Sequence, residues 1–320
     1  MKEKPFIHCF RTYNCCYFYD FNTNAIVRIP ESVYVHLQHL EKGTANISEC
    51  DADVNEILNR LTEQGFLSSH HWCKIEHPAS RLLENYLEGS VQSLTLQVTQ
   101  QCNLKCEYCP YSGGFYNRQH NNRKMSFEIA KKAIDFYFLH SFDIPDAQIG
   151  FYGGEPLIEF EMIRRIVEYC NNEYYGKKIR YFVTTNATLL TEEKIDFLMK
   201  NNFVLTISLD GPRQYHNKNR HRVDDTGSFD IVMENIKMVY RKYPDKKENI
   251  QFNCVIDPEA DLKCINDFFI KEEALREYRV LFNSISREGI KEDDKFLPGD
   301  SYFEQYEYLS LIHISEPTRP

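Results

Sequence analysis

The first 70 residues carry two different periods of apolar positions. Short apolar runs predict three strands, at residues 6–10, 15–20 and 25–29. Apolar residues three or four positions apart then predict two amphipathic helices, with buried faces formed by Val33, Leu37 and Leu40, and by Val54, Ile57, Leu58 and Leu61. Gly65 is placed to end the second helix. A β-hairpin followed by two helices predicts a small winged-helix-like domain over residues 1–70. Residues 71–92 are expected to form a linker with one short helix.

A different pattern begins at residue 93, where strand-like runs alternate with amphipathic helical segments. The expected strands lie at residues 94–98, 147–152, 179–185, 203–209, 250–256 and 278–283. Ser126 and Thr191 stand where helix N-caps are expected. Alternation of this kind is typical of parallel βα units, so residues 93–290 predict an α/β fold, a partial (β/α)6 barrel.

Unusual residues follow four of these strands. A cysteine-rich loop, Cys102 to Cys109, follows the first, and Gly153-Gly154-Glu155-Pro156 follows the second. Asn186 follows the third, and the fourth ends at Ser208 and Asp210. Active sites of parallel βα folds form at the carboxyl ends of the strands. The four stretches are therefore expected to share one rim of the barrel.

Composition narrows the role of the cysteines. The chain begins MKEKPFIHCF with no signal-peptide-like apolar run, and no stretch approaches the roughly 18 apolar residues of a membrane span. We therefore expect a cytoplasmic protein that has no membrane partner and in which thiols stay reduced. An odd total of 11 cysteines also fits a disulfide framework poorly. The net charge of −9 disfavours a nucleic-acid partner.

The spacing C-x3-C-x2-C places Cys102, Cys106 and Cys109 in one loop. Structural zinc sites are closed by four protein ligands, and most simple iron–sulfur clusters use four cysteines. Three thiols in one loop leave either a distant fourth ligand or an open coordination position. A zinc site closed by a remote Cys or His therefore remains an alternative.

CNLKCEYC, residues 102–109, resembles the signature loop of radical S-adenosylmethionine (SAM) enzymes, with Tyr108 at its aromatic position. The resemblance implies that Cys102, Cys106 and Cys109 hold a [4Fe–4S] cluster whose fourth iron binds SAM. It also implies reductive cleavage of SAM to a 5′-deoxyadenosyl radical, with electrons from a donor such as flavodoxin or ferredoxin. No catalytic residue beyond the cluster is assigned.

Three further segments resemble SAM-contacting parts of that family. Gly153-Gly154-Glu155-Pro156 is similar to the site for the methionine amine. TTNA (184–187) and SLDGP (208–212) resemble later contact segments, which implies roles for Asn186, Ser208 and Asp210 in binding SAM. Taken alone, a Gly-Gly-Glu-Pro sequence is more often only a turn, and Asp210 could equally stabilise its own loop.

GGEPLIE, TTNATLLT and SLDGPRQYHNKNR together resemble the branch of peptide-modifying enzymes that carry a SPASM or twitch domain. YFYDFNTNAIVRIPESVYVHL (17–37) is similar to the opening of maturases of ribosomally made, cysteine-rich peptides. This implies that residues 1–70 bind the leader of a precursor peptide, and that the reaction forms a thioether. One alternative is a formylglycine-generating sulfatase maturase. Another is a non-catalytic leader-binding module with a structural metal.

The end of the chain departs from this resemblance. Residues 291–308 are expected to begin a C-terminal SPASM-type region that is otherwise missing, and with it the cysteines for auxiliary [4Fe–4S] clusters. LSLIHISEPTRP (309–320) resembles a translated sequencing adapter, so we expect it to be non-native.

Overall fold

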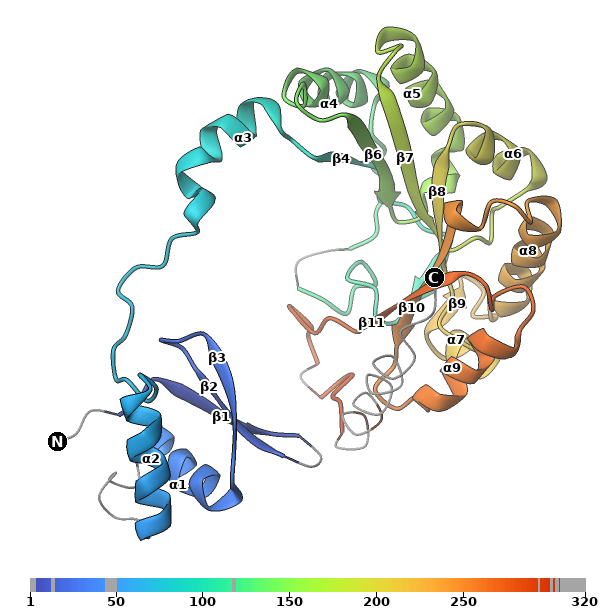
Figure 1. Ribbon diagram of the computed structural model, residues 1–320. Helices are drawn as coiled ribbons and strands as arrows, with labels where there is room; N and C mark the ends of the chain where they lie inside the picture. Colours follow the sequence, from blue (N-terminus) through green and yellow to red (C-terminus); the bar gives the residue numbers. More distant parts are fainter. Residues whose placement is uncertain are drawn as a thin grey trace. The chain divides into compact units, whose positions relative to one another are not determined.

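The computed structural model describes residues 4–12, 15–43, 51–116, 119–292, 294–299, 302 and 305. The chain divides into two compact units, Met1–Ser80 and Arg81–Pro320. Figure 1 shows both, coloured along the sequence from blue to red. The division falls inside the segment that was expected to be a linker. The expectation for residues 309–320 lies outside the described residues.

The first unit is a three-stranded antiparallel sheet with two helices. Its strands are β1 (Ile7–Arg11), β2 (Cys16–Asp20) and β3 (Ala25–Ile29), in the order β1-β2-β3. The helices are α1 (Glu31–Lys42) and α2 (Ala52–Glu63). Gly43 ends α1 in the left-handed conformation, and Gly65 follows the end of α2 with φ +90°. The elements expected in this unit are therefore present, while its winged-helix-like character stays a prediction.

The apolar residues predicted to form the helix faces make the core of this unit. Phe18, Val33 and Leu37 are fully buried there, and Leu58 is nearly so. Asp20, also fully buried, accepts hydrogen bonds from the backbone N–H groups of Asn22, Thr23 and Leu67. A buried carboxylate is stable only when it is hydrogen-bonded in this way. Asp20 thereby connects the β2–β3 turn to the segment that follows α2.

The second unit contains a six-stranded sheet in which every neighbouring pair is parallel. In the order β11-β10-β8-β7-β6-β4, its strands are β11 (Arg279–Ser284), β10 (Ile250–Ile256), β8 (Phe203–Ser208), β7 (Lys178–Thr185), β6 (Asp146–Gly153) and β4 (Ser93–Thr99). The predicted partial barrel is thus confirmed, and each predicted strand is present within one or two residues.

Helices cover the outside of this curved sheet (Figure 1). They are α4 (Phe127–Leu139), α5 (Phe160–Glu173), α6 (Glu192–Lys200), α8 (Phe229–Lys242) and α9 (Leu262–Lys271). The short helices are η1 (Pro78–Leu82), α3 (Leu83–Gly89), η2 (Pro156–Glu159), α7 (Arg213–Asn219) and η3 (Lys247–Asn249). Ser126 caps α4 and Thr191 caps α6, each accepting a hydrogen bond from a backbone N–H of the first turn.

The core of the barrel lies between the helices and the outer face of the sheet. Alternate strand residues such as Ile149, Val183 and Leu205 are fully or almost fully buried against the helices. The intervening residues face the concave side of the sheet. Within the described ranges, no helix has the length and apolar character that crossing a bilayer requires.

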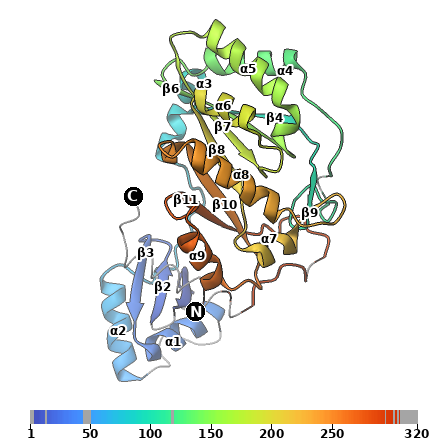
Figure 2. The same ribbon diagram turned by 90° about the vertical axis from the view of Figure 1, so that its right-hand side faces the viewer.

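A two-stranded antiparallel ladder stands apart from the main sheet. It pairs β5 (Leu104–Cys106) with β9 (Arg220–Arg222), and Cys106 lies opposite Arg220. The second strand follows α7 at the carboxyl end of β8 (Figures 1 and 2). The ladder therefore fixes the cysteine loop against the segment that follows Ser208-Leu209-Asp210.

Candidate active site

A cavity of about 280 Å³ opens at the carboxyl ends of the parallel strands. Its lining includes residues from each of the four strand ends at which the sequence predicted a site, as expected for a parallel βα fold. Residues of the cysteine loop line one side, and Thr184, Ser208, Asn253 and Ser284 come from four neighbouring strands. The predicted residues that line it are Cys102, Cys106, Tyr108, Cys109, Gly153, Gly154, Asn186 and Ser208.

Three other predicted residues do not line the cavity. Glu155, Pro156 and Asp210 lie behind its wall, where all three are buried. The structure therefore separates the predicted site into a lining of thiols and small polar groups, and a supporting layer that contains the carboxylates.

Each thiol of the cysteine loop lies next to a nitrogen atom. The backbone nitrogen of Leu104 is 3.4 Å from Cys102 Sγ, Arg220 Nη1 is 3.9 Å from Cys106 Sγ, and His120 Nε2 is 3.9 Å from Cys109 Sγ. His120 is oriented by its Nδ1, which lies 3.0 Å from the Gln100 carbonyl oxygen. Nitrogen donors beside sulfur are typical of the surroundings of bound metal centres.

Burial controls the protonation of these thiols. It raises the pKa of Cys102 to about 11 and that of Cys106 to about 12, and it also raises the pKa of Cys109. The thiols are therefore protonated at neutral pH when no metal is bound. A metal centre that binds here must displace those protons, so its binding energy offsets the cost of forming three buried thiolates.

The three thiols fit the cluster that the cysteine spacing implies. Cys102, Cys106 and Cys109 come from one loop and line one cavity, and a [4Fe–4S] cluster takes one thiolate at each of several iron atoms. Among the described residues, no group of three His, Cys, Asp or Glu side chains forms a site for a single metal ion.

The two glycines at the end of β6 are required because the backbone of the Thr99–Cys102 segment passes too close to leave room for a side chain. Gly153 has φ +148°, and a Cβ there would overlap the carbonyl oxygen of Thr99. A Cβ on Gly154 would overlap the carbonyl oxygen of Gln101. The backbone nitrogen atoms of Gly154 and Glu155 donate to those same two carbonyls, at 3.0 and 2.8 Å. The close approach that glycine permits is thus to the cysteine loop itself.

Glu155 joins the ends of two strands. Its carboxylate accepts hydrogen bonds from Thr185 Oγ1 at 2.7 Å, from the Asn186 backbone N–H at 2.8 Å and from the Leu157 backbone N–H at 3.0 Å. Burial raises the pKa of this carboxyl, and the three hydrogen bonds and the nearby Lys194 oppose that rise. Asn186 is likewise engaged, with its side-chain Nδ2 3.0 Å from Asn103 Oδ1.

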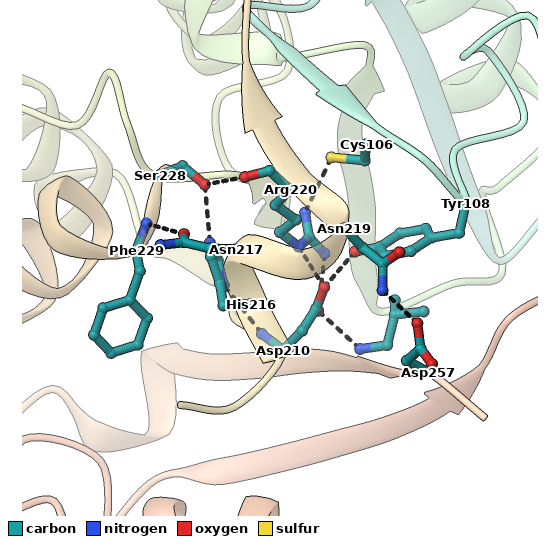
Figure 3. Close-up of polar contacts among 11 residues, drawn as sticks. Cys106, Tyr108, Asp210, His216, Asn217, Asn219, Arg220, Ser228, Phe229 and Asp257 are labelled. Atoms are coloured by element: carbon teal, nitrogen blue, oxygen red, sulfur yellow. Dashed lines mark hydrogen bonds and ion pairs between the residues drawn. The ribbon is translucent and has the colours of Figure 1, made fainter. Parts of the chain in front are cut away.

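Asp210 is the centre of a buried network (Figure 3). It accepts from Arg220 Nε at 2.7 Å and from Arg220 Nη2 at 3.1 Å, which is a two-pronged ion pair. Tyr108 OH donates to the same carboxylate at 2.5 Å, and the Val255 backbone N–H donates at 2.9 Å. The network connects the cysteine loop with the ends of β8 and β10.

His216 extends this network through neutral hydrogen bonds (Figure 3). Its Nδ1 accepts from the Asp210 backbone N–H at 3.3 Å, so the proton of the neutral ring lies on Nε2, which faces Ser228 Oγ at 2.9 Å. Ser228 Oγ in turn donates to the Arg220 carbonyl oxygen at 3.1 Å. Burial lowers the pKa of His216 to about 3, which keeps the ring neutral.

Sequence reasoning missed Arg220, His120 and Thr185 as parts of the site. Arg220 is the last residue of the quoted segment SLDGPRQYHNKNR, and a basic residue placed there was the available signal. Thr185 belongs to the quoted TTNA segment. His120 follows the cysteine loop in a polar stretch that gave no signal, because only the folded loop brings its ring to Cys109.

Residues 96–268 match the radical SAM superfamily, and this chain belongs to it. Members of this superfamily are enzymes that use a [4Fe–4S] cluster and SAM, and these are the cofactors that its fold implies. The match covers the cysteine loop and five of the six strands of the barrel.

The chain is similar to the serine-type anaerobic sulfatase-maturating enzyme of Bacteroides thetaiotaomicron, with 31% identity over 52% of this chain and 37% of that protein. Its fold is similar to that of anSMEcpe with bound AdoMet (TM-score 0.60, 22% identity, 70% and 61% of the two chains). It also resembles Streptococcus suis SuiB bound to precursor peptide SuiA (TM-score 0.50, 15% identity, 98% and 70%). The chain spans about a third to a half of the length of the curated relatives it matches.

Proposed function

We propose that this chain is the SAM-cleaving part of a peptide maturase that modifies a ribosomally made, cysteine-rich peptide. The observation that carries the proposal is the cavity that gathers Cys102, Cys106 and Cys109 with Gly154, Asn186 and Ser208 at the strand ends. When bound, the cluster and SAM together supply a 5′-deoxyadenosyl radical that removes a hydrogen atom from the peptide.

Within this proposal the residues divide into two roles. Cys102, Cys106 and Cys109 hold the cluster, while Tyr108, Gly153, Gly154, Asn186 and Ser208 shape the adjoining SAM site. Glu155, Pro156 and Asp210 support SAM binding indirectly, because they fix the loops on which the lining residues stand. The hydroxyl of Ser208 is suited to a hydrogen bond with the carboxylate or ribose of SAM.

The first unit is proposed to bind the leader of the precursor peptide by adding it as a strand at β3. At the outer edge of β1, the Cys9 backbone N–H already donates to Glu41 Oε2 at 3.1 Å. β3 forms the other edge, and among the described residues no strand pairs with its outer side. Ile26 on β3 is 63% exposed and offers an apolar contact.

Two alternatives remain. Similarity to a sulfatase-maturating enzyme favours formylglycine formation as the second candidate reaction. The two chemistries differ in the group that the product carries. A thioether and a formylglycine formed from serine each remove two hydrogen atoms from the peptide, but only the thioether consumes a cysteine thiol and only formylglycine is an aldehyde. Formylglycine formed from cysteine replaces sulfur and two hydrogens by oxygen. A non-catalytic binding module would leave both peptide and SAM unchanged.

Anaerobic loading of the full chain with iron and sulfide tests the proposal. We expect the absorption and electron paramagnetic resonance (EPR) signals of a [4Fe–4S] cluster, and 5′-deoxyadenosine formation that depends on a reductant. Replacing Cys102, Cys106 or Cys109 by Ala should abolish both. Cys264→Ala, at a partly exposed position in α9, is the matched control and should retain both. A loaded wild type that never cleaves SAM would contradict the proposal.

A precursor peptide encoded beside this chain should bind equally well to wild type and to Cys106→Ala. The proposed leader site lies on the first unit and uses no residue of the cavity. Fluorescence anisotropy of the labelled peptide measures the dissociation constant. Ile26→Asp should weaken binding about tenfold or more, because a charge then replaces a buried apolar contact. Equal affinity of the Ile26→Asp chain would argue against the β3 edge.

A further inference from the structure

Arg220 is held within reach of a cysteine that is proposed to bind the cluster. Two of its three side-chain nitrogen atoms, Nε and Nη2, are used by Asp210. The third, Nη1, lies 3.9 Å from Cys106 Sγ (Figure 3). Both side chains of the ion pair are at least nine-tenths buried. Arg220 also lines the cavity, where it is the one arginine among the described lining residues.

Its position is over-determined by the surrounding structure. Arg220 pairs with Cys106 across the β5–β9 ladder, so the two backbones are in fixed register. Asp210, which orients the guanidinium, is itself fixed by Tyr108 OH and by the Val255 backbone N–H. The guanidinium carbon lies 5.4 Å from the centroid of the Tyr108 ring. Because Asp210 engages Nε and Nη2, the plane of the guanidinium is fixed, and its third nitrogen, Nη1, is held facing the Cys106 sulfur.

A buried ion pair of this kind is not explained by stability alone. Removing both charges from water costs several kcal/mol per ion, and apolar residues of similar volume often serve stability as well or better. The arrangement does, however, place a permanent positive charge beside Cys106.

We propose that Arg220 is a positioning residue for electron transfer, which donates a hydrogen bond to Cys106 Sγ and raises the reduction potential of the cluster. This inference rests on the proposed function, because it requires Cys106 to be a cluster ligand. The step is the addition of one electron from a one-electron donor of the flavodoxin or ferredoxin class. No bond forms or breaks and no proton moves, so the site gains one unit of negative charge. A fixed cation and an N–H donor at the sulfur stabilise that charge.

The test is a redox titration of the loaded full-length chain without SAM, followed by EPR. We expect Arg220→Gln to shift the midpoint potential to a more negative value, with a fall of about tenfold or more in the reduction equilibrium constant, which is about 59 mV for one electron. Arg220→Lys keeps the charge but loses the fork, and should lie between wild type and Arg220→Gln. Arg222→Gln removes an exposed arginine two residues along the same strand, and should leave the potential unchanged.

A second measurement separates a direct contact from a general structural effect. Wild-type chain containing ¹⁵N-labelled arginine should show a ¹⁵N coupling to the reduced cluster in pulsed EPR, and Arg220→Lys should lose it. Absence of that coupling in wild type overturns the inference, even where Arg220→Gln binds too little iron to titrate. A loaded Arg220→Gln chain with the wild-type potential also overturns it. A wild-type chain that takes up no cluster overturns the proposed function, and this inference with it.

Discussion

The buried carboxylates around the cavity form their hydrogen bonds with other protein groups, so they stabilise the loops and do not face the cavity. Glu155 and Asp210 are almost fully buried, and each accepts at least three hydrogen bonds from protein donors. The lining consists of the three thiols, Gly153, Gly154 and polar side chains such as Asn186 and Ser208, together with larger side chains such as Tyr108 and Arg220. This division suits a site that must hold a large cofactor, because the lining groups keep free hydrogen-bonding capacity only if other residues fix the loops.

His216 predicts a dependence of stability on pH. Its pKa in the folded chain is about 3, below the ordinary value near 6.5, because burial disfavours the charged ring. Between pH 6.5 and pH 3, His216 is therefore protonated in the unfolded chain but stays neutral in the folded chain. The stabilisation is complete above pH 6.5 and is lost as the pH falls from 6.5 toward 3, by about 2 kcal/mol at pH 5.

Replacing His216 by Gln should remove this contribution. Glutamine can still accept from the Asp210 N–H and donate toward Ser228, but it does not titrate. Urea unfolding at pH 7 and pH 5 measures the difference, and the variant should lose less stability on acidification than wild type. His221→Gln, five residues further along and partly exposed, is the control. An equal acid effect in wild type and His216→Gln would show that the ring does not titrate as described.

At the scale of elements, the barrel rim is held by contacts between loops that follow different strands. The loop after β4 bonds to the loop after β6 through Thr99 and Gln101, and Glu155 then joins β6 to the end of β7. The β5–β9 ladder and the Asp210–Arg220 pair do the same for β8. The cavity is thus built from a chain of neighbouring strand ends.

Glu155→Gln tests one of these connections. The carboxylate accepts from three donors, and an amide in its place turns one acceptor into a donor that faces either the Thr185 hydroxyl and Leu157 N–H or the Asn186 N–H. We expect the free energy of unfolding of the barrel to fall by roughly 1–3 kcal/mol. Chemical denaturation followed by circular dichroism measures it. Glu161→Gln, six residues further along at an exposed ion pair with Arg164, should cost less than about 1 kcal/mol. Equal losses in both variants would contradict the role of Glu155.

At the scale of the whole molecule, the residues that the structure describes form two separate hydrophobic cores. One cluster contains only residues up to Leu67, and the other only residues from Val91 onward. Each core is closed by helices of its own unit. The proposed leader-binding unit and the proposed SAM site therefore lie in parts of the chain that can be altered one at a time.

Two cores predict two unfolding transitions in calorimetry. Leu58→Ala, in the first core, should lower only one transition, and Leu198→Ala, in the barrel core, should lower only the other. Each substitution is expected to cost about 2–5 kcal/mol, because it deletes a buried side chain and leaves a cavity. A single transition that both variants lower by the same amount would mean that the two units unfold as one.

The sequence by itself determined the elements and the location of the site. Apolar periodicity is a local property, so six parallel strands and their helices could be predicted from residue spacing, and the carboxyl-end rule then placed the cysteine loop, Gly153-Gly154 and Asn186 at one rim. The same rule predicted that Ser208 lies at this rim, and Ser208 lines the cavity.

Only the tertiary structure decided which polar residues face the cavity and which support it. Glu155 and Asp210 look like ligand residues in the sequence, but their partners Thr185, Asn186, Arg220 and Val255 come from other strands. The contact of Arg220 with Cys106 joins residues 114 positions apart. Such pairings depend on the register and curvature of the folded sheet, which no local pattern encodes, because hydrogen-bond direction is set only when distant backbones are held in place.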